Sequence, residues 1–329
     1  MRALVLDHDH SLEVQQREQP EIQPGTTLVR ITGCGICGTD RHISKGEYPA
    51  QPPVILGHEF GGVVLETSPG SPAQVGDLVS VDPNITCGTC VDCQAGRTAF
   101  CPELTALGVD IDGGLSEVIA APNAQVYVLA PQVTPLHAAF AEPLACCLRG
   151  MDLASLRGGE RVAVLGGGVI GQLTAQLARL AGADVTMVTR HPVRRALALE
   201  LGARRAMTLL DAVPGEYDVV FECAGSTQTF TAALGLARRG GTVIVLGLTA
   251  QDAVVPIRPF DLVVQELRIV GSFLNPGTQA RACALISEGS VVVEPLVSRV
   301  VGLEEAALLL HQDPAPGEVK IIVDPSRQV

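Results

Sequence analysis

The sequence has few aromatic residues and no tryptophan, since Phe, Trp and Tyr together make up 3% of its 329 residues. Charged residues are scarce at 18%, whereas apolar residues reach 47%, a balance that excludes disordered and coiled-coil proteins. Basic residues are in the minority, because 23 Lys and Arg stand against 35 Asp and Glu and leave a net charge of −12. This acidic balance argues against nucleic acid or an anionic membrane as the main partner and favours a small molecule.

Long hydrophobic runs are also missing, and none reaches the roughly 18 residues that a membrane helix needs. The amino-terminal MRALVLDHDH does not have the basic start and apolar core of a secretory signal. Ten cysteines are present, and six of them fall in one amino-terminal stretch with CxxC spacing. This spacing favours metal or catalytic use in a reducing compartment, so we expect a cytoplasmic protein.

The pattern of apolar residues predicts two kinds of architecture along the chain. The first 130 or so residues carry short β-branched runs, TLVRIT, GGVVLE and DLVSVD, separated by Gly and Pro as in an all-β domain. From Arg161 on, the strand RVAVLG is followed by Leu173, Leu177 and Leu180 at helical spacing and then by the strand DVTMVT. The strands YDVVFECAG and GTVIVLGL follow, separated by the helix-like TFTAALGLARRGG. Such repeats predict a parallel sheet with helices on both faces.

The carboxyl-terminal EVKIIVD is an apolar strand that we expect to return to the sheet of the first domain. A chain of this length predicts about two domains. We therefore expect a discontinuous β-rich domain made of residues 1–143 and 274–329. A nucleotide-binding domain of residues 144–273 interrupts it.

The strongest motif is a run of four cysteines, Cys87, Cys90, Cys93 and Cys101, in CGTCVDCQAGRTAFC. Four soft thiolates in one loop form a closed tetrahedral zinc site, which stabilises the fold and has no open position for chemistry. The alternatives are free or disulfide-linked cysteines, or a zinc ribbon that grips nucleic acid. Arg97 is the only basic residue of this lobe, which disfavours the ribbon.

A second set of ligands is spread over GCGICGTDRH, GHEF and AEPL. Cys37, His58 and Glu59, together with Glu142, could bind a zinc that keeps one position for water or substrate. An open zinc is a Lewis acid that lowers the pKa of a bound alcohol. Whether Glu59 or Glu142 is the direct ligand stays open, and the GHE segment could also be a simple polar turn.

Three polar residues beside the first cysteine could support such a zinc. Asp40 is a candidate acceptor for the second ring nitrogen of His58. Thr39 and His42 are candidates for the relay that carries the released proton outward.

The third motif is VAVLGGGVIGQLTAQLA, in which a strand is followed by glycines in GxGxxG register and a helix. Gly166 permits the tight turn, Gly168 lets the backbone approach a pyrophosphate, and Gly171 allows close helix packing. Val169 and Ile170, between the last two glycines, open the helix whose amino terminus attracts the phosphates.

The next strand indicates which dinucleotide is bound. An NAD site has Asp or Glu at the end of this strand for the ribose hydroxyls, whereas this chain has Thr189 and Arg190, with Arg194 and Arg195 one turn later. Guanidinium groups bind a 2′-phosphate that a carboxylate would repel. We therefore favour NADP over NAD. The alternative is that the arginines are only a solvated start of a helix.

These motifs together resemble the zinc-dependent medium-chain alcohol dehydrogenase superfamily, and the resemblance runs over essentially the whole chain. CGICGTD, GHE, the four-cysteine lobe, GxGxxG and VGSF stand in the order in which the family has them. The resemblance implies a GroES-like β-rich catalytic domain plus a Rossmann domain, hence an α/β fold with a doubly wound parallel sheet. It also implies two zinc ions per chain and a homodimer or homotetramer.

The resemblance also assigns residues. Glu142 stands where alcohol dehydrogenases have cysteine and polyol dehydrogenases have glutamate, so EPL points to the polyol branch. Cys37, His58 and Glu59 match the catalytic zinc positions. Thr39 and His42 match the proton-relay positions. The structural zinc positions are matched by Cys87, Cys90, Cys93 and Cys101. The loops along the nicotinamide are matched by Leu246, Gly247, Ser272 and Phe273.

Two departures put sorbitol itself in doubt. Leu274 and Asn275 replace the Arg-Tyr pair that sorbitol-type members carry after VGSF, and Ile43 stands where those enzymes often have an aromatic residue. We expect a zinc-dependent oxidoreductase that transfers a hydride between NADP(H) and a secondary alcohol or ketone, such as a polyol, sugar alcohol or cyclitol. The alternatives are an L-threonine or simple alcohol dehydrogenase and a non-catalytic NADPH-binding or sensor protein.

Overall fold

The computed structural model describes residues 1–327, and its contacts divide the chain into two compact units. Unit 1 contains Met1–Glu142, Pro276–Ala315 and the segment that begins at Lys320. Unit 2 contains Pro143–Asn275 and Pro316–Val319. Within residues 1–327, no helix has both the length and the apolar character that a membrane crossing requires.

Unit 1 is built around two sheets. The smaller sheet has the antiparallel order β2-β1-β4, with β1 at Arg2–Leu6, β2 at Leu12–Gln16 and β4 at Val54–Ile55. The larger has the order β10-β6-β5-β3-β18-β17, and β9 also pairs with β3. Its strands are β3 (Thr26–Gly35), β5 (Glu59–Thr67), β6 (Leu78–Val81), β9 (Val118–Pro122), β10 (Val126–Val128), β17 (Val297–Val301) and β18 (Lys320–Val323).

Strand β18 confirms the prediction that EVKIIVD returns to the sheet of the first domain. Its residues Ile322 and Val323 pair antiparallel with Gly35 and Cys34 of β3. All four residues of β18 are buried, which explains why the segment is apolar except for Lys320. The return places β18 beside the carboxyl end of β3.

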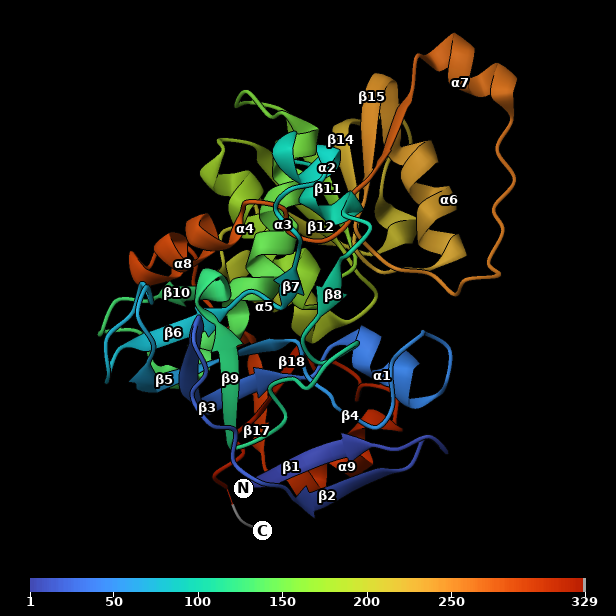
Figure 1. The fold of residues 1–329 in the computed structure, drawn as a ribbon. Coiled ribbons are helices and arrows are strands. Elements are labelled where there is room, and N and C mark those ends of the chain that lie inside the picture. Colours follow the sequence, from blue (N-terminus) through green and yellow to red (C-terminus); the bar gives the residue numbers. More distant parts are fainter. Residues whose placement is uncertain (328–329) are drawn as a thin grey trace. The chain divides into compact units, whose positions relative to one another are not determined.

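The helices of unit 1 are short, as the lack of long helical patterns predicts. Helix α9 packs against β1 and β2 (Figure 1), and its Leu303 and Leu310 join the core of Leu4, Leu6 and Phe60. The regular elements of unit 1 outside these two sheets are α1 (Gly38–Ser44), α2 (Val91–Gln94), α8 (Gln279–Ser287), α9 (Leu303–Leu310), β7 (Asn84–Ile85), β8 (Thr105–Ala106) and the 3₁₀ turns η1 (Thr98–Phe100), η2 (Asn123–Gln125), η3 (Pro135–Phe140) and η5 (Glu294–Leu296).

Unit 2 contains one parallel six-stranded sheet in the order β13-β12-β11-β14-β15-β16. The chain reverses its direction of progress between β11 and β14, and a crevice at such a switch point is where doubly wound folds bind ligands. The strands are β11 (Arg161–Leu165), β12 (Asp184–Val188), β13 (Arg205–Met207), β14 (Tyr217–Glu222), β15 (Ala237–Val245) and β16 (Arg268–Gly271).

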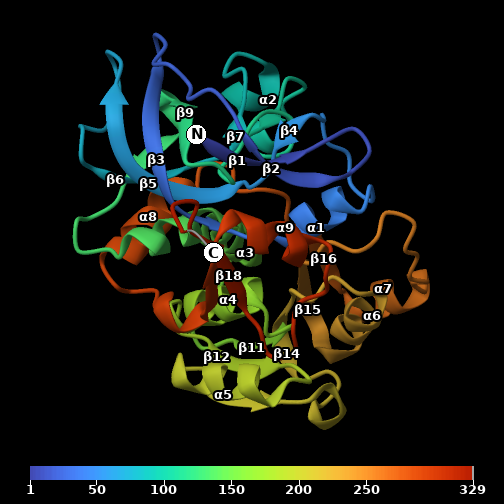
Figure 2. The ribbon, with the colours of Figure 1, turned by 90° about the horizontal axis from the view of Figure 1, so that it is seen from below.

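Helices pack on both faces of this sheet, which confirms the predicted α/β architecture. Alternate residues of β11 point to opposite faces: Val164 packs with Ala178 of α4, whereas Leu165 packs with Ala233 of α6. Figure 2 shows α4 beside β11 and β12. The remaining elements are α3 (Ala141–Ala154), which spans the boundary between the units, α4 (Val169–Leu180), α5 (Pro192–Glu200), η4 (Leu209–Asp211), α6 (Thr227–Leu236) and α7 (Pro259–Gln265).

One predicted helix is shorter in the structure than the sequence pattern indicates. The segment TFTAALGLARRGG reads as helical to Gly241, but α6 ends at Leu236 and β15 begins at Ala237. The pairing with β14 shifts register between Ala237 and Thr242, and Gly240 has a φ of +71°. A bulge therefore takes up the arginines and glycines that the sequence pattern places in the helix.

Candidate metal centres and coenzyme site

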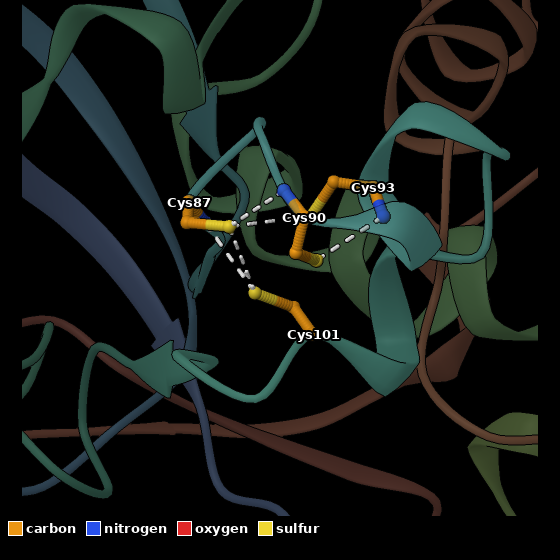
Figure 3. A group of neighbouring side chains, drawn as sticks. All are labelled: Cys87, Cys90, Cys93 and Cys101. Carbon is orange, nitrogen blue, oxygen red and sulfur yellow. Dashed lines mark hydrogen bonds between the residues drawn. The ribbon is translucent and has the colours of Figure 1, made fainter.

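The four predicted cysteines converge in one lobe of unit 1 between β7 and β8. The sulfur atoms of Cys87, Cys90, Cys93 and Cys101 all lie within 4.8 Å of one another (Figure 3). The Cys87 sulfur lies 3.6 Å from that of Cys101 and 3.9 Å from that of Cys93. We call these four residues the cysteine group.

Backbone geometry favours ionisation in the cysteine group. The backbone N–H groups of Thr89 and Cys90 donate to the Cys87 sulfur and lower the pKa of that thiol to about 6. Burial and the neighbouring Cys90 thiol raise the pKa of Cys93 to about 11. Four sulfur ligands with one thiolate already favoured fit a zinc ion, which would also hold the other three as thiolates. The fit is to a closed, structural zinc.

A second group brings a thiol, an imidazole and a carboxylate together in unit 1. Ligand atoms of Cys37, His58 and Glu59 all lie within 4.8 Å of one another, and we call these residues the mixed-ligand group. Cys37 precedes α1, while Glu59 is the first residue of β5 and pairs with Gly35 of β3. A Cβ on Gly35 would lie 2.1 Å from the Glu59 Oε2 atom, so only glycine leaves room for this carboxylate.

Asp40 orients the histidine of the mixed-ligand group. The Oδ1 atom of Asp40 lies 3.1 Å from Nδ1 of His58, while its Oδ2 accepts a hydrogen bond from the Cys37 backbone N–H at 2.8 Å. Apart from this mutual approach, Oδ1 and Nδ1 have no partner among residues 1–327. Nδ1 thus faces the carboxylate, which leaves Nε2 as the nitrogen for a metal.

Charge dominates the electrostatics around His58. Burial alone would lower the pKa of His58, but the negative charges of Asp40 and Cys37 outweigh burial and raise that pKa well above its usual range. Surroundings that favour a cation so strongly also favour a bound metal ion. Thiolate, imidazole and carboxylate are ligands of catalytic zinc sites with an open position, so the donor set fits such a zinc.

A buried lysine also binds the carboxylate of the mixed-ligand group. Lys320 of β18 is 3% exposed and donates to Glu59 Oε2 at 2.5 Å and to the Ile36 carbonyl at 2.9 Å. Burial opposes a charged lysine, but Glu59 and Cys37 raise the pKa of Lys320. Glu59 therefore has a cationic partner within the protein itself.

The other residues predicted for the reaction occupy three positions. Thr39 and His42 lie on α1, and His42 Nδ1 approaches Oε2 of the exposed Glu47 to 2.7 Å. Glu142 is 7% exposed and lies in the first turn of α3. Among the residues that the structure describes, the mixed-ligand group contains Glu59 and does not include Glu142.

The predicted glycine fingerprint forms the turn between β11 and α4 in unit 2. Gly166 has a φ of +106°, and a Cβ there would lie 2.8 Å from the backbone nitrogen of Ala224. A Cβ on Gly171 would lie 1.7 Å from the Gly166 carbonyl oxygen, so the helix can start this close only with glycine. Val169 and Ile170 form the half-buried first turn of α4 that follows Gly168.

The arginines after β12 serve different purposes. Thr189 is 8% exposed directly after the strand, and Arg190 is exposed with its Nε 3.2 Å from Nε2 of His191. Arg195 donates to the carbonyls of Thr189 and Arg190, both at 2.9 Å, and Arg194 donates to the Glu318 carbonyl. Among residues 1–327, Arg194 and Arg195 thus bind backbone carbonyls, whereas the guanidinium of Arg190 contacts the ring of His191.

The predicted nicotinamide residues lie at the carboxyl ends of β15 and β16. Leu246 and Gly247 donate their backbone N–H groups to the Glu222 carbonyl, each at 2.9 Å. Ser272 donates its backbone N–H to the Val245 carbonyl at 2.9 Å, and Phe273 is 49% exposed. The Ser272 hydroxyl is buried without a partner among residues 1–327.

Sequence reasoning missed Lys320, Glu47 and Glu222. Lys320 interrupts the apolar run of EVKIIVD, and a charge inside a buried strand is a signal that could have found it. Glu222 ends the apolar strand YDVVFE, is fully buried and accepts hydrogen bonds from the backbone of Ala224 at 2.9 Å and Gly225 at 3.0 Å. Glu47 follows His42 by five residues in a loop, where no periodicity would mark it.

Two family models match the chain, the first within unit 1 and the second from the start of α4 onward. Residues 23–131 match the alcohol dehydrogenase GroES-like domain, and residues 169–288 match the zinc-binding dehydrogenase domain. D-arabinitol dehydrogenase 1 of Uromyces fabae is 30% identical over 99% of this chain and 97% of its own length. D-altritol 5-dehydrogenase of Agrobacterium fabrum is 33% identical over 92% of this chain and 93% of its own length.

A solved structure is similar over nearly the full length. It is a protein of Sinorhizobium meliloti, provisionally described as a zinc-binding dehydrogenase, bound to NADP. The TM-score is 0.95 at 43% identity, over 98% of this chain and 99% of that one. The chain belongs to the zinc-type medium-chain alcohol dehydrogenase superfamily, in its polyol-dehydrogenase-like branch. It is an alcohol or polyol dehydrogenase with a GroES-like domain and a Rossmann domain.

Proposed function

We propose that the protein transfers a hydride between NADP(H) and a secondary alcohol or its ketone, the alcohol being a polyol, sugar alcohol or cyclitol. The observation that carries the proposal is the mixed-ligand group, whose thiol, imidazole and carboxylate lie within 4.8 Å of one another. The similarity to arabinitol and altritol dehydrogenases supports a substrate with several hydroxyl groups.

In this proposal the mixed-ligand group holds the catalytic zinc and the cysteine group holds the structural zinc. A zinc ion bound to the mixed-ligand group would supply a Lewis acid that lowers the pKa of the substrate hydroxyl. Asp40 holds the ring of His58 so that Nε2 faces the metal position. Glu142 completes the set, either as a direct ligand or as a hydrogen-bond partner of the fourth ligand.

The proton released from the substrate leaves through α1. Thr39 passes it to His42, whose Nδ1 already lies 2.7 Å from the Glu47 carboxylate. Glu47 is exposed, so it can exchange the proton with water. In this proposal His42 accepts the proton at one ring nitrogen and releases another from Nδ1 to Glu47.

For the coenzyme, we propose that the turn at Gly166, Gly168 and Gly171 binds the pyrophosphate and that Arg190 binds a 2′-phosphate. Thr189 carries no negative charge and therefore does not repel that phosphate. Val169, Ile170, Leu246, Gly247, Ser272 and Phe273 are proposed as further coenzyme contacts. The similarity to a protein whose structure contains NADP supports this coenzyme over NAD.

The coenzyme assignment is tested by replacing Arg190→Asp and measuring the dissociation constants of NADPH and NADH. NADPH binding should weaken at least about tenfold, because a charge-assisted hydrogen bond is replaced by repulsion. The matched control is Arg157→Asp, which makes the same charge change in an exposed position before β11, at the opposite ends of the strands. Unchanged NADPH affinity in the Arg190 variant would refute the assignment.

We also propose a homo-oligomer formed through the β16 edge of the sheet in unit 2. Strand β16 pairs with β15 on one side and ends the sheet on the other. The preceding helix α7 and its approach are apolar and exposed: Val254 is 83% exposed, Phe260 68% and Val263 75%. A second copy pairing at β16 would satisfy the strand and cover these side chains.

The oligomer proposal is tested by light scattering after size-exclusion chromatography. Wild-type protein should run as a dimer or tetramer, and Val263→Asp should shift it toward smaller species. An exposed valine in another part of unit 2, Val213, provides the matched control Val213→Asp. A monomeric wild-type protein would contradict the proposal.

Finally, we propose that the protein works in the cytoplasm on a small molecule, with neither nucleic acid nor membrane as partner. The thiols of the cysteine group must stay reduced to hold a metal, which suits a reducing compartment. The net charge of −12 disfavours polyanions. Equal activity of cytosolic and membrane fractions would contradict this localisation.

A further inference from the structure

A buried glutamine links the glycine turn to the arginine-bearing helix. Gln172 follows Gly171 on α4 and is 0% exposed. Its Nε2 donates to the carbonyl of Gly167 at 3.3 Å and to the carbonyl of Arg194 at 2.9 Å. One side-chain amide thus bonds both the turn predicted to bind pyrophosphate and the first turn of α5.

The orientation of this amide is fixed by its partners. Both are carbonyl oxygens, which accept hydrogen bonds, so the NH₂ end of Gln172 must face them. Its Oε1 is left buried without a partner among residues 1–327. An unpaired buried acceptor is unfavourable, and an apolar side chain of the same size would avoid it. The two hydrogen bonds that Gln172 donates therefore offset the unfavourable burial of its unpaired Oε1.

Gly167 shows how closely the two segments pack. A Cβ on Gly167 would lie 2.9 Å from Cγ2 of Thr189 and 3.0 Å from Cβ of Arg194, both closer than ordinary contact. The middle glycine of GGG therefore lets the end of β12 and the start of α5 touch the turn. Both residues therefore support the contact between the glycine turn and the start of α5. Gln172 donates a hydrogen bond to each segment, and Gly167 leaves the space for them to touch.

We propose that Gln172 is a positioning residue for coenzyme choice, which holds the 2′-phosphate position at a fixed distance from the pyrophosphate turn. This inference rests on the proposed use of NADP. The pyrophosphate is common to NAD and NADP and is bound by the turn alone. Thr189 and Arg190 stand where an NAD site has the carboxylate for the ribose hydroxyls, so only the 2′-phosphate of NADP has a charged partner after β12. Displacement of α5 relative to the turn therefore weakens NADP and leaves NAD largely unaffected.

The test compares dissociation constants of NADPH and NADH for wild type and Gln172→Met, measured by the fluorescence of the reduced nicotinamide. Methionine keeps the volume and removes both donated bonds. The ratio of NADPH to NADH affinity should fall about fivefold, with NADH binding changed less than about twofold. The matched control is Gln176→Met, a buried residue one turn further along α4, which should keep the wild-type ratio.

A second variant covers the case in which Gln172→Met does not fold. Gly167→Ala separates the turn from Thr189 and Arg194 while leaving Gln172 in place, and it should lower the ratio in the same direction. A ratio unchanged in the variant that folds, or an equal loss for both coenzymes, would overturn the positioning role alone. Wild-type protein that binds NADH better than NADPH would overturn the proposed NADP function as well.

Discussion

The Glu59 carboxylate and the Lys320 ammonium form a buried ion pair of 2.5 Å, with both side chains at most 3% exposed. Glu59 also belongs to the mixed-ligand group, so one carboxylate has two possible cationic partners. Lys320 supplies the charge balance from within the chain. A zinc ion would supply the same balance from outside.

Replacing Lys320→Met should therefore destabilise the metal-free protein more than the zinc-loaded protein. Removing one partner of a buried pair leaves an uncompensated charge and costs about 3 to 5 kcal/mol. Zinc gives that charge a new partner, so the rise in unfolding midpoint on zinc addition should be larger in the variant than in wild type. Dye-based thermal unfolding with and without zinc measures both midpoints.

The matched control is Lys45→Met. Lys45 pairs with Asp313 at 3.3 Å, but its side chain is 37% exposed and that of Asp313 is 90% exposed. A pair of this kind contributes little, and the zinc response should equal that of wild type. The same rise in unfolding midpoint for Lys320→Met and Lys45→Met would contradict the idea that zinc and Lys320 stabilise the same Glu59 carboxylate.

Loss of one sulfur from the cysteine group should remove one zinc per chain. Cys101→Ala leaves three thiols, and because binding of a structural metal is coupled to folding, the loss in stability should exceed about 4 kcal/mol. Elemental analysis and thermal unfolding give the two readouts. Cys283→Ala removes an equally buried sulfur outside both metal groups and should keep the zinc content; an equal zinc content in the two variants would exclude the cysteine group as a metal site.

The buried carboxylate of Glu222 should support the turn that follows β14. It accepts from the backbone of Ala224 and Gly225 and, at 2.7 Å, from the Thr229 hydroxyl. Glu222→Gln removes the charge from these bonds and should lower the unfolding free energy by about 2 kcal/mol. Urea unfolding measures it, and Glu216→Gln, at a partly exposed pair with Arg205, should have a smaller effect.

Asp218 should make part of the stability pH-dependent. Burial would raise the pKa of Asp218, but hydrogen bonds from Arg238 and the Arg161 backbone lower it below the usual range. A lowered pKa means that the contribution is present above the unfolded pKa of about 3.9 and is lost as the pH falls through the folded value.

The variant Asp218→Asn should therefore be less stable than wild type at pH 7, by about 1 kcal/mol. The difference between the two should shrink as the pH is lowered toward 3. Urea midpoints measured across this range test the sign. A difference that grew on acidification would contradict it.

The sequence predicted the sites whose ligands are close in the chain better than those assembled by the fold. The cysteine group lies within 15 residues, from Cys87 to Cys101, so spacing alone indicates it. The glycine turn and Arg190 are likewise read from one strand, turn and helix. Local spacing encodes these sites because the ligands share one or two elements.

The contact of Lys320 with Glu59 could not be predicted from local spacing, because it forms only through the pairing of β18 with β3, across 261 residues of sequence. Gln172 was missed for a related reason. Its carbonyl partners lie on a turn and on a second helix, and helical spacing shows only that it is on the buried face. The early end of α6 depended on a register shift between two strands, which no single segment encodes.

The proposed hydride transfer is tested most directly by following nicotinamide absorbance with NADP⁺ and, separately, NAD⁺. The alcohols are polyols, cyclitols, L-threonine and simple alcohols, each with and without a metal chelator, on protein whose zinc content has been measured. We predict two zinc ions per chain and chelator-sensitive reduction of NADP⁺ by an alcohol with adjacent hydroxyl groups. No reduction of either coenzyme by any of these alcohols in protein that carries both zinc ions, or reduction that survives complete removal of zinc, would contradict the proposed function.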